Sequence, residues 1–351
     1  MRIETIKKAL TDADADAFII SSYQNRRYIS AFTGSEGLLV ITTKDKPLLL
    51  VDGRYTIQAK EQAKGFDVVQ FNKGPYSLLE KFFYKRIFVE EEKITLSQCN
   101  KLREVFPDVE FLTGSNILNN LRAIKTKEEA ASIKKAAAIA DKAFLHILDY
   151  IKPGQTEKEV ALELNYFMQK NGADGIAFDT IIASSVRSAL PHAQPTTNKI
   201  PSKGFVVLDF GCVFDGYCSD ITRTISMGAA STEMVNVYNT VLRAQQKALK
   251  KIKNGVLCND VDKIARDEID SAGFGNNFVH SLGHGVGLEV HEKPVLSSRS
   301  ESVLKAGNVV TVEPGIYIED KFGVRIEDLV VVTEQGCINL TTAPKELIEK
   351  K

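Results

Sequence analysis

Two acidic residues stand in segments whose pattern predicts buried strands joined as a hairpin. The apolar run FVVLD ends at Asp209, and Asp220 follows an Asp215-Gly216 pair that is typical of a two-residue turn. A hairpin with this turn places Asp209 opposite Thr222. Because directly opposed and next-but-one residues share a face of the sheet, Asp209 and Asp220 are predicted to lie on one face as diagonal neighbours.

A second acidic pair follows the same logic nearer the C-terminus. The segments NVVTVE, which ends at Glu313, and GVRIED, which contains Glu327, predict a hairpin centred on Asp320. This hairpin puts Glu313 directly opposite Glu327. Two like charges that close on an apolar sheet repel each other and are costly to bury. Protonation as an acid dyad or a nearby Arg could compensate the repulsion, and a bound cation could do so for all four carboxylates together.

One histidine completes an oxygen-rich set of candidate metal ligands. His284 lies in the stretch GHGVG, where glycines on both sides let the backbone run close to a site. Two Asp, two Glu and one His fit a pair of first-row divalent ions such as Mn²⁺, Co²⁺ or Zn²⁺, and do not fit a Cys-rich structural zinc site. Any one carboxylate alone would be interpreted as a surface charge or a strand-end cap. A structural Ca²⁺ site is disfavoured by the His, because Ca²⁺ prefers oxygen ligands.

Further histidines could move protons. His192 is held between two prolines in LPHAQP, and His291 begins HEKP, so neither fits a helix interior. Each could be a free imidazole that donates a proton or stabilises an oxyanion, or a loop residue without a role. His280 could support His284 from four residues away or be structural. His146 lies within a helical pattern and is interpreted as a packed helix residue.

The elements that must position these residues form two groups, and the first occupies about 115 residues. Six short apolar runs there predict strands, and segments 54–63 and 95–106 between them predict helices. This pattern favours an α/β domain with a mixed sheet. The predicted strands are Ala17–Ser22, Gly37–Thr43, Pro47–Val51, Asp67–Phe71, Arg86–Glu90 and Val109–Leu112.

The second group contains a repeated pattern of two helices. Segments 126–129 and 156–159 are capping boxes, which predict helix starts. The break IKxG at residues 151–154 recurs at residues 252–255, after an offset of 101 residues. Each copy has a helix, the break, a second helix, a closing Gly and β-rich segments. We therefore predict two related αα-ββ halves that face each other across a cleft, although IKxG could also be only a common helix stop.

Composition limits the function classes. Lys+Arg and Asp+Glu both number 45 in 351 residues, and the zero net charge argues against a general nucleic-acid or anionic-membrane binder. No apolar run approaches the ~18 residues of a membrane span, and the polar N-terminus is not typical of a secretory signal. Five cysteines without CxxC spacing argue against a disulfide framework, so we expect a cytoplasmic protein.

Together these motifs resemble the pita-bread metallopeptidase family, which includes methionine aminopeptidase, aminopeptidase P and prolidase. The resemblance spans about residues 120–340 and rests on LPHAQP, VLDFG with FDGYCSDITRT, HSLGHGVGLEVHEKP, TVEPGIYI and GVRIEDLVVV. It implies a catalytic pita-bread domain over residues 119–351 with two divalent ions, Mn²⁺ foremost. By motif match, the implied metal ligands are Asp209, Asp220, His284, Glu313 and Glu327.

The resemblance also implies individual roles. In the family the second Asp and the last Glu bridge both ions, which here are Asp220 and Glu327. Glu313 is implied as the general base, and His192 and His291 match histidines that contact the substrate and stabilise the transition state.

The N-terminal motifs narrow the choice within the family. YISAFTGSEG and DGRY resemble the creatinase-type N-terminal domain of aminopeptidase P and prolidase, which methionine aminopeptidases lack. This implies such a domain over residues 1–118, proline-containing peptides as substrates and a homodimer. Creatinase itself does not keep the metal ligands, whereas all five matching residues are present here.

The subtype depends on one departure from the prolidase pattern. Archaeal-type prolidases have an Arg directly after the HExP motif, which is thought to hold the carboxylate of the substrate. Here that position is Val295, although Arg299 or Arg325 could substitute. The departure, together with the FTGSEG and DGRY segments, favours an Xaa-Pro aminopeptidase, with an Xaa-Pro dipeptidase (prolidase) as the alternative. A non-catalytic binding protein on the same fold is disfavoured by the intact ligand set, and a metal-dependent amidohydrolase acting on a non-peptide is a further competitor.

Overall fold

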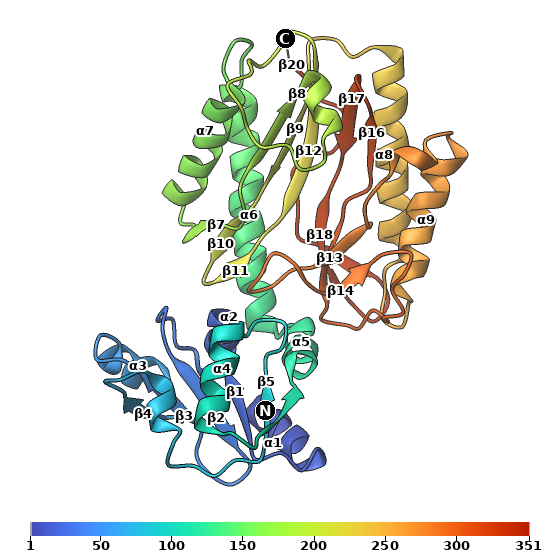
Figure 1. Cartoon of the computed structure of the whole chain (residues 1–351). Helices are drawn as coiled ribbons and strands as arrows, with labels where there is room; N and C mark the ends of the chain where they lie inside the picture. Colours follow the sequence, from blue (N-terminus) through green and yellow to red (C-terminus); the bar gives the residue numbers. More distant parts are fainter. Residues whose placement is uncertain (1, 351) are drawn as a thin grey trace. The chain divides into compact units, whose positions relative to one another are not determined.

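Residues 2–350 are described by the computed structural model, in which the chain forms two compact units, Met1–Arg122 and Ala123–Lys351 (Figure 1). Each unit has its own sheets and core, and each is described by itself. Both units combine helices with sheets, which confirms the predicted α/β class. None of the helices between residues 2 and 350 combines the length and hydropathy that a bilayer span requires.

The first unit is built on a six-stranded mixed sheet of order β4-β3-β2-β1-β5-β6. The β1–β2 and β2–β3 pairs are antiparallel, whereas β3–β4, β1–β5 and β5–β6 are parallel. All six predicted strands are present, with ends within two residues of the predicted bounds. They are β1 (Ala17–Ile20), β2 (Leu38–Thr42), β3 (Leu48–Val51), β4 (Asp67–Gln70), β5 (Arg86–Val89) and β6 (Glu110–Thr113).

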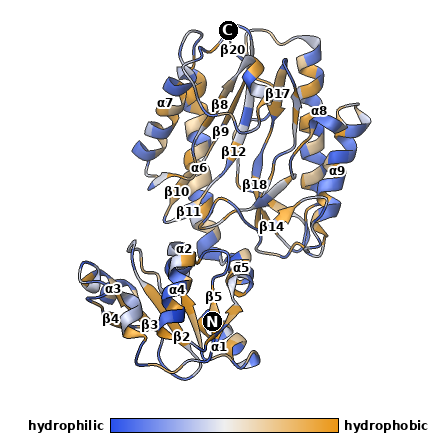
Figure 2. Ribbon diagram, viewed as in Figure 1, coloured by the Kyte–Doolittle hydropathy of each residue, from blue (hydrophilic) through white to orange (hydrophobic). Residues whose placement is uncertain are grey.

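Helices bury this sheet because their apolar sides face it. The central strand β1 is buried along its whole length, and the strands are largely hydrophobic (Figure 2). Both predicted helices are present as α3 and α4, and α4 begins at a capping box between Thr95 and Gln98. The helical segments are α1 (Arg2–Asp12), α2 (Tyr23–Ser30), α3 (Thr56–Gln62), η1 (Pro75–Leu78), α4 (Leu96–Val105) and α5 (Ser115–Ala123).

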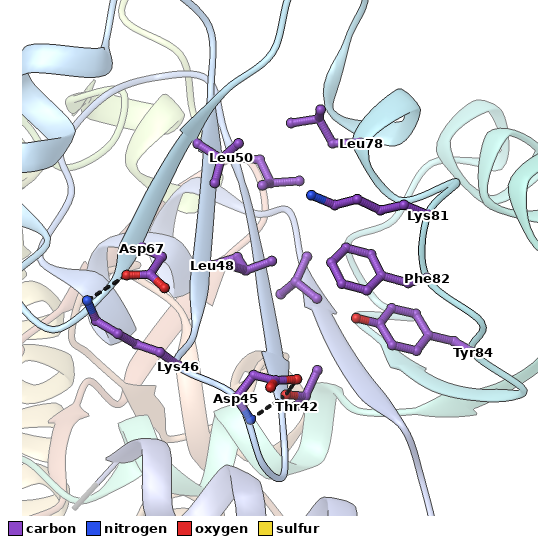
Figure 3. Close-up of a pocket in the computed structure, with 12 residues that line it drawn as sticks. Thr42, Asp45, Lys46, Leu48, Leu50, Asp67, Leu78, Lys81, Phe82 and Tyr84 are labelled. Carbon is purple, nitrogen blue, oxygen red and sulfur yellow. Dashed lines mark hydrogen bonds and ion pairs between the residues drawn. The ribbon is translucent and has the colours of Figure 1, made fainter.

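A cavity of about 270 Å³ opens on one face of the same sheet (Figure 3). Leu48 and Leu50 lie along it on β3, and the stacked rings of Phe82 and Tyr84 face them from the chain that follows η1. A short 3-10 turn and irregular chain cover this part of the sheet in place of a long helix. The cavity is therefore a place where the two layers pack incompletely.

The second unit contains two helix pairs and the remaining strands. Its four-stranded sheet has the order β20-β12-β9-β8, and its five-stranded sheet has the order β14-β13-β15-β18-β19. The helices are α6 (Lys127–Tyr150), α7 (Glu157–Lys170), α8 (Thr232–Lys251), α9 (Cys258–Ser271) and the short η2 (Ser185–Ala189) and η3 (Gly275–Asn277). The strands are β7 (Gly175–Ile176), β8 (Ile181–Ser184), β9 (Gly204–Phe210), β10 (Cys212–Phe214), β11 (Tyr217–Cys218), β12 (Ile221–Met227), β13 (Gly283–Gly285), β14 (Glu292–Leu296), β15 (Val309–Val312), β16 (Gly315–Ile318), β17 (Phe322–Arg325), β18 (Asp328–Val332), β19 (Cys337–Asn339) and β20 (Glu349–Lys350).

The two helix pairs repeat each other, as the sequence predicts. Helices α6 and α8 both end just before an IKxG break, and α7 and α9 have the same length and the same offset of 101 residues. The glycine of each break donates a 2.9 Å hydrogen bond to a later carbonyl, Gly154 to Ile200 and Gly255 to Leu304. Thr126 and Thr156 form the predicted capping boxes. The repetition therefore extends to backbone geometry.

Each helix pair covers the outer face of one sheet. One core joins α6 and α7 to β8, β9 and β12, and a separate core joins α8 and α9 to β15 and β18. In Figure 1 the strands of the second unit lie between the two helix pairs. Strand β12 of the four-stranded sheet also bonds to the chain that leads into β18: Thr224 Oγ1 donates to the Arg325 carbonyl of β17 at 2.9 Å, and the Glu327 amide donates to the Thr222 carbonyl at 3.1 Å.

The repeated breaks predict matched effects on stability. Gly154 and Gly255 have φ of 91° and 84°, and a Cβ at either position would meet nothing within 4 Å. Gly154→Ala and Gly255→Ala should therefore each lower the free energy of unfolding by about 1–2 kcal/mol through backbone strain alone. Chemical denaturation measures this change, with Gly336→Ala as the control because its Cβ also meets nothing and its φ lies outside the left-handed region. Equal stabilities of all three variants would contradict the expectation.

Candidate metal centre

The first acidic hairpin has the register that the sequence predicts. Asp209 of β9 pairs with Thr222 of β12. Beyond this ladder, β10 and β11 are closed by Asp215 and Gly216, whose φ angles of 49° and 75° suit a two-residue hairpin turn. Asp220 directly precedes β12. Asp209 and Asp220 therefore lie near the same end of this strand pair.

The second acidic hairpin also has its predicted register. Val312 pairs with Asp328 and Gly315 pairs with Arg325, so one register continues through both short ladders. Glu313 and Glu327 fall opposite each other where the strands are interrupted between these ladders. The turn is centred on Asp320, with a φ of 57°. The prediction that this hairpin opposes two glutamates is confirmed.

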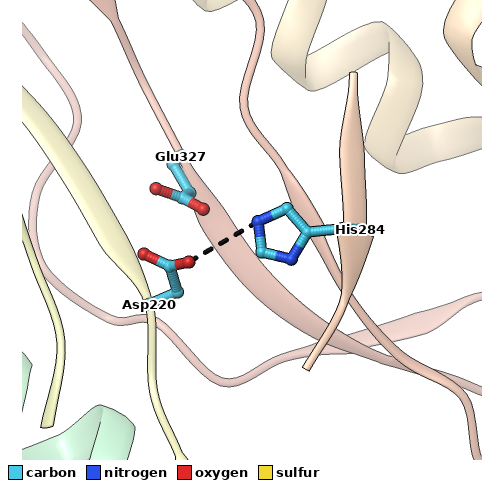
Figure 4. Close-up of side chains that lie close together, drawn as sticks. All are labelled: Asp220, His284 and Glu327. Carbon is cyan, nitrogen blue, oxygen red and sulfur yellow. Dashed lines mark ion pairs between the residues drawn. The ribbon is translucent and has the colours of Figure 1, made fainter. Parts of the chain in front are cut away.

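Three of the five predicted ligands form a compact cluster (Figure 4). Ligand atoms of Asp220, His284 and Glu327 all lie within 4.8 Å of one another. His284 extends from β13 of the second half, and its Nε2 is 3.6 Å from Asp220 Oδ2. Donor atoms around one metal ion have a spacing of this kind. The cluster contains residues from both halves of the second unit.

The other two predicted ligands border this cluster. His284 Nε2 is 3.2 Å from Glu313 Oε1, and the same oxygen accepts a 3.2 Å hydrogen bond from Thr311 Oγ1. Asp209 is 8% exposed. Electrostatic repulsion couples its carboxylate to those of Asp220, Glu313 and Glu327. The fold therefore brings all five predicted side chains to one place.

Burial and mutual repulsion oppose ionisation of three of the carboxylates. Burial raises the pKa of Asp209, although Arg325 acts in the opposite direction. Burial raises the pKa of Asp220 well above its ordinary range, and the charge of Glu327 adds to the increase. Burial likewise raises the pKa of Glu327 well above its ordinary range, and the charge of Glu313 adds to it. The sequence analysis names a nearby Arg as one way to compensate the repulsion between carboxylates, and Arg325 provides this for Asp209.

The fourth carboxylate is held in its ionised form by the histidine. Burial opposes ionisation of Glu313, but the hydrogen bond with His284 and the charge of its ring bring the pKa of Glu313 down to about 2. Burial likewise opposes protonation of His284, and the contact with Glu313 outweighs it and raises the pKa of His284. Glu313 and His284 therefore stabilise opposite charges on each other.

Two buried oxygens point to divalent cations. Within residues 2–350, Asp209 Oδ1 and Glu327 Oε1 are buried and accept no hydrogen bond. A buried carboxylate oxygen without a partner is costly unless a cation or a proton compensates it. Four carboxylates and one imidazole match first-row divalent ions in ligand type. The donor set therefore fits the metal ions that the resemblance implies.

Arg325 links the carboxylates to the surrounding structure. Its Nη2 donates to Asp209 Oδ2 at 2.6 Å, and its Nε donates to Thr222 Oγ1 at 3.0 Å. That hydroxyl in turn donates to Glu327 Oε2 at 2.7 Å. Further hydrogen bonds run from Nη1 to Tyr317 Oη and to the Pro191 carbonyl. Because this buried guanidinium is already engaged, Arg325 orients ligands, and it is a poor substitute for a cation that holds the substrate.

A second arginine lies on the opposite side of the same strands. Arg223 is 1% exposed and donates to the carbonyls of Thr222 and Glu327, besides its ion pair with Asp328 at 2.8 Å. These bonds hold β12 of the first half against the start of β18 in the second half. The backbone on both sides of the cluster is therefore fixed by buried arginines.

The three other histidines predicted near the site occupy different environments. His192 and His291 are exposed, and the ring of His291 lies 4.2 Å from that of His284. Both ends of the LPHAQP loop are held, because Arg325 donates to the Pro191 carbonyl and Arg187 donates to the Gln194 carbonyl. Although the side chain of His291 is exposed, partial loss of contact with water lowers the pKa of its ring, and the charge of His284 adds to the decrease.

His280 has a supporting position, a role that the sequence left open. Its Nδ1 lies 2.8 Å from the Ser281 carbonyl, and its Nε2 lies 2.9 Å from Tyr317 Oη. Tyr317 Oη accepts from Arg325, so it can donate to Nε2 of a neutral His280. Burial lowers the pKa of His280, which favours that neutral form. His280 thus ends a chain of hydrogen bonds that leads through Arg325 to Asp209.

Two sheets that bring together four carboxylates and a histidine, three of the carboxylates buried, offer the donor set of a metallohydrolase. Residues 131–334 match the family model described as metallopeptidase family M24, and residues 2–124 match the creatinase/prolidase N-terminal domain. The chain belongs to metallopeptidase family M24, and its fold consists of a creatinase-type N-terminal domain and a pita-bread domain. The family resemblance and the fold class predicted from the sequence are confirmed.

Several relatives match almost the whole chain. The Xaa-Pro dipeptidase of Pyrococcus furiosus is 40% identical over 349 residues, which are 99% of each chain. The solved structure of an Xaa-Pro dipeptidase from Bacillus anthracis is 42% identical, with a TM-score of 0.96 and 99% of each chain covered. The X-Pro aminopeptidase from Thermotoga maritima is also 42% identical, with a TM-score of 0.89, and the match covers 96% of this chain and 98% of that one.

The raised pKa values predict that metal binding releases protons. Asp220, Glu327 and His284 have raised pKa values, so at a pH between their ordinary and raised values they carry protons that a divalent ion must displace. Titration calorimetry of metal-free protein with Mn²⁺, in buffers of different ionisation enthalpy, should show proton release and an affinity that rises with pH. Glu327→Gln should release fewer protons. Equal heats in all buffers would contradict this expectation.

The same shifts set the pH dependence of stability without metal. A carboxyl group whose folded pKa is raised contributes stability that is present below its unfolded pKa and is lost as the pH rises through the folded value. The contribution of Asp220 and Glu327 to the stability of metal-free protein should therefore fall toward neutral pH, where Mn²⁺ should restore it.

Proposed function

We propose that the protein is an Xaa-Pro dipeptidase whose divalent metal ions are held by Asp209, Asp220, His284, Glu313 and Glu327. The observation that carries the proposal is the Asp220–His284–Glu327 cluster, bordered by two buried carboxylate oxygens without hydrogen bonds among the described residues. Membership of a metallopeptidase family supports hydrolysis of a peptide bond. The names of close relatives support proline as the residue after that bond.

This chemistry suits the bond before proline. The nitrogen of that bond carries no hydrogen, so an enzyme cannot hold the substrate through it. Divalent ions bound at the centre would supply Lewis acidity to the substrate carbonyl and lower the pKa of the attacking water. Glu313 is the proposed proton acceptor, because it lies in the centre and its low pKa keeps it ionised at neutral pH.

His192 and His291 are the proposed groups that contact the substrate. Both are exposed, and the Pro191 carbonyl beside His192 accepts a hydrogen bond from Arg325, which also donates to Asp209; the ring of His291 lies 4.2 Å from that of His284. An imidazole in such a position can donate a hydrogen bond to the developing oxyanion or a proton to the departing proline nitrogen. Neither is needed as a ligand in this proposal, because the cluster of Asp220, His284 and Glu327 and the bordering Asp209 and Glu313 supply five other side chains.

The names of several relatives support the dipeptidase, whereas the sequence favours the aminopeptidase. Val295 in place of an Arg favours an aminopeptidase, whereas proteins named Xaa-Pro dipeptidase match 99% of this chain. One observation keeps the Xaa-Pro aminopeptidase as the second candidate. Val295 pairs with His284 across β13 and β14 and is 40% exposed, so an apolar surface lies where a cation could hold a free carboxylate. Mn²⁺ as the native ion, a homodimer and a cytoplasmic location stay predictions.

Substrate length tests the proposal and its alternative. With Mn²⁺ present, we expect a higher kcat/KM for an Xaa-Pro dipeptide than for the Xaa-Pro-Xaa tripeptide with the same first residue, measured by release of that residue. The matching Xaa-Ala dipeptide is the control for proline selectivity. Faster cleavage of the tripeptide would establish the aminopeptidase instead. Hydrolysis of neither proline peptide would overturn both.

The role of His192 has its own test. His192→Ala should lower kcat on the proline substrate by about 10²–10³, the usual effect of losing one donor to the transition state. The metal content, measured by elemental analysis, should equal that of the wild type because no ligand is removed. A loss of metal in parallel with activity would make His192 a ligand, and unchanged turnover would leave it a loop residue without a role.

A further inference from the structure

A buried ion pair joins Glu292, the residue after His291, to the distant Lys125. Lys125 Nζ and Glu292 Oε2 are 3.0 Å apart, and their side chains are only 1% and 5% exposed. The two residues are separated by 167 positions. Removing two charges from water is costly, so a buried pair is weak evidence for a stabilising role. The role of the pair is therefore better judged from the segments that Lys125 and Glu292 connect than from its contribution to stability.

The lysine belongs to a segment that is fastened to the catalytic sheet. The Lys125 amide donates to the Gly307 carbonyl at 2.8 Å, and Ile124 forms a β-bridge with Asn308. Asn308 Nδ2 also donates to the Ala123 carbonyl at 2.8 Å. Asn308 directly precedes β15, the strand that leads to Glu313. Lys125 thus starts from a backbone that is fixed to the metal-ligand scaffold.

The glutamate closes the loop between β13 and β14. Glu292 Oε1 accepts a 3.1 Å hydrogen bond from the Glu289 amide. A Cβ built on Gly287 would lie 2.4 Å from Glu292 Oε2, so the carboxylate rests directly against the start of this loop. The Gly287 carbonyl accepts from the Cys218 amide at 2.8 Å, two residues before Asp220. The carboxylate of Glu292 therefore holds both ends of residues 287–292 together.

His291 lies on this loop and depends on it for its orientation. Its side chain is exposed, and within residues 2–350 its ring makes no hydrogen bond. The ring lies 4.2 Å from the His284 ring at an interplanar angle of 62°. Because no hydrogen bond fixes the ring, the position of the imidazole depends on the loop backbone that holds it beside His284.

We propose that Lys125 is a positioning residue for His291. Lys125 acts on His291 through the carboxylate of Glu292. The proposal rests on the substrate-contacting role of His291 in the proposed function. By fixing Glu292, the ammonium group holds the 287–292 loop in the form that keeps the His291 ring beside the metal centre. Misplacement by about 1 Å can cost 10²-fold in rate, so a loosened loop should affect turnover without removing any ligand.

A double-mutant cycle distinguishes positioning from general support. Lys125→Met should lower kcat on the Xaa-Pro dipeptide by about 10- to 100-fold with unchanged metal content. In the background of His291→Ala the same substitution should change kcat by less than about twofold, because the group that it positions is gone. Equal losses in both backgrounds would overturn the proposal. Lys247→Met is the matched control, since Lys247 pairs with Glu268 on the exposed side of α8 and α9.

Two further measurements keep the test decisive. If Lys125→Met does not fold, the double variant Lys125→Met/Glu292→Gln removes both buried charges and takes its place in the cycle. The NMR signals of the His291 ring, assigned by their loss in His291→Ala, should shift or broaden in Lys125→Met and stay unchanged in Lys247→Met. An unmoved His291 signal would overturn the positioning role even if the protein hydrolyses proline peptides. A moved signal in a protein without that activity would refute only the proposed function.

Discussion

The mutual repulsion of four carboxylates, three of them buried and Glu313 half-buried, is the constraint on which the second unit depends. Asp209, Asp220, Glu313 and Glu327 converge from two hairpins, and burial alone already opposes their ionisation. The protein supplies partial compensation through Arg325, Thr222 and His284. Two carboxylate oxygens still have no partner among the described residues. This remaining deficit favours a cation over a neutral ligand, because a neutral ligand could not reduce the repulsion.

Such a centre needs a scaffold that resists separation of the like charges. Two helix pairs with the same breaks each cover a sheet, and the candidate ligands lie between them. Buried Arg223 and Arg325 bind backbone and side-chain oxygens on both sides of the junction. Hydrogen bonds of this kind involve charged donors and are stronger than neutral ones. The arginines therefore hold the strands in place against the repulsion that the carboxylates create.

The sequence predicts the hairpins better than it predicts their surroundings. The register of each acidic pair depends on a local turn at Asp215-Gly216 or Asp320, and local turn chemistry can be recognised in a sequence. The contact of Arg325 with Asp209 spans 116 positions and joins two sheets, so no pattern of spacing indicates it. Thr222 could have been found, because the predicted hairpin places it opposite Asp209. The subtype prediction rests on Val295 together with the FTGSEG and DGRY segments, and neither an apolar position nor these N-terminal motifs define how a substrate carboxylate is held.

The division of the ligands between the repeated halves has a consequence for how the molecule acquires function. Asp209 and Asp220 belong to the first half, whereas His284, Glu313 and Glu327 belong to the second. Neither half alone carries the cluster of Asp220, His284 and Glu327. With the proposed ligands, cation affinity would be a property of the docked pair, and a bound ion would cross-link the two halves. A nascent chain would complete this ligand set only when Glu327, which follows β17, is in place, so late folding would be coupled to the start of chemistry.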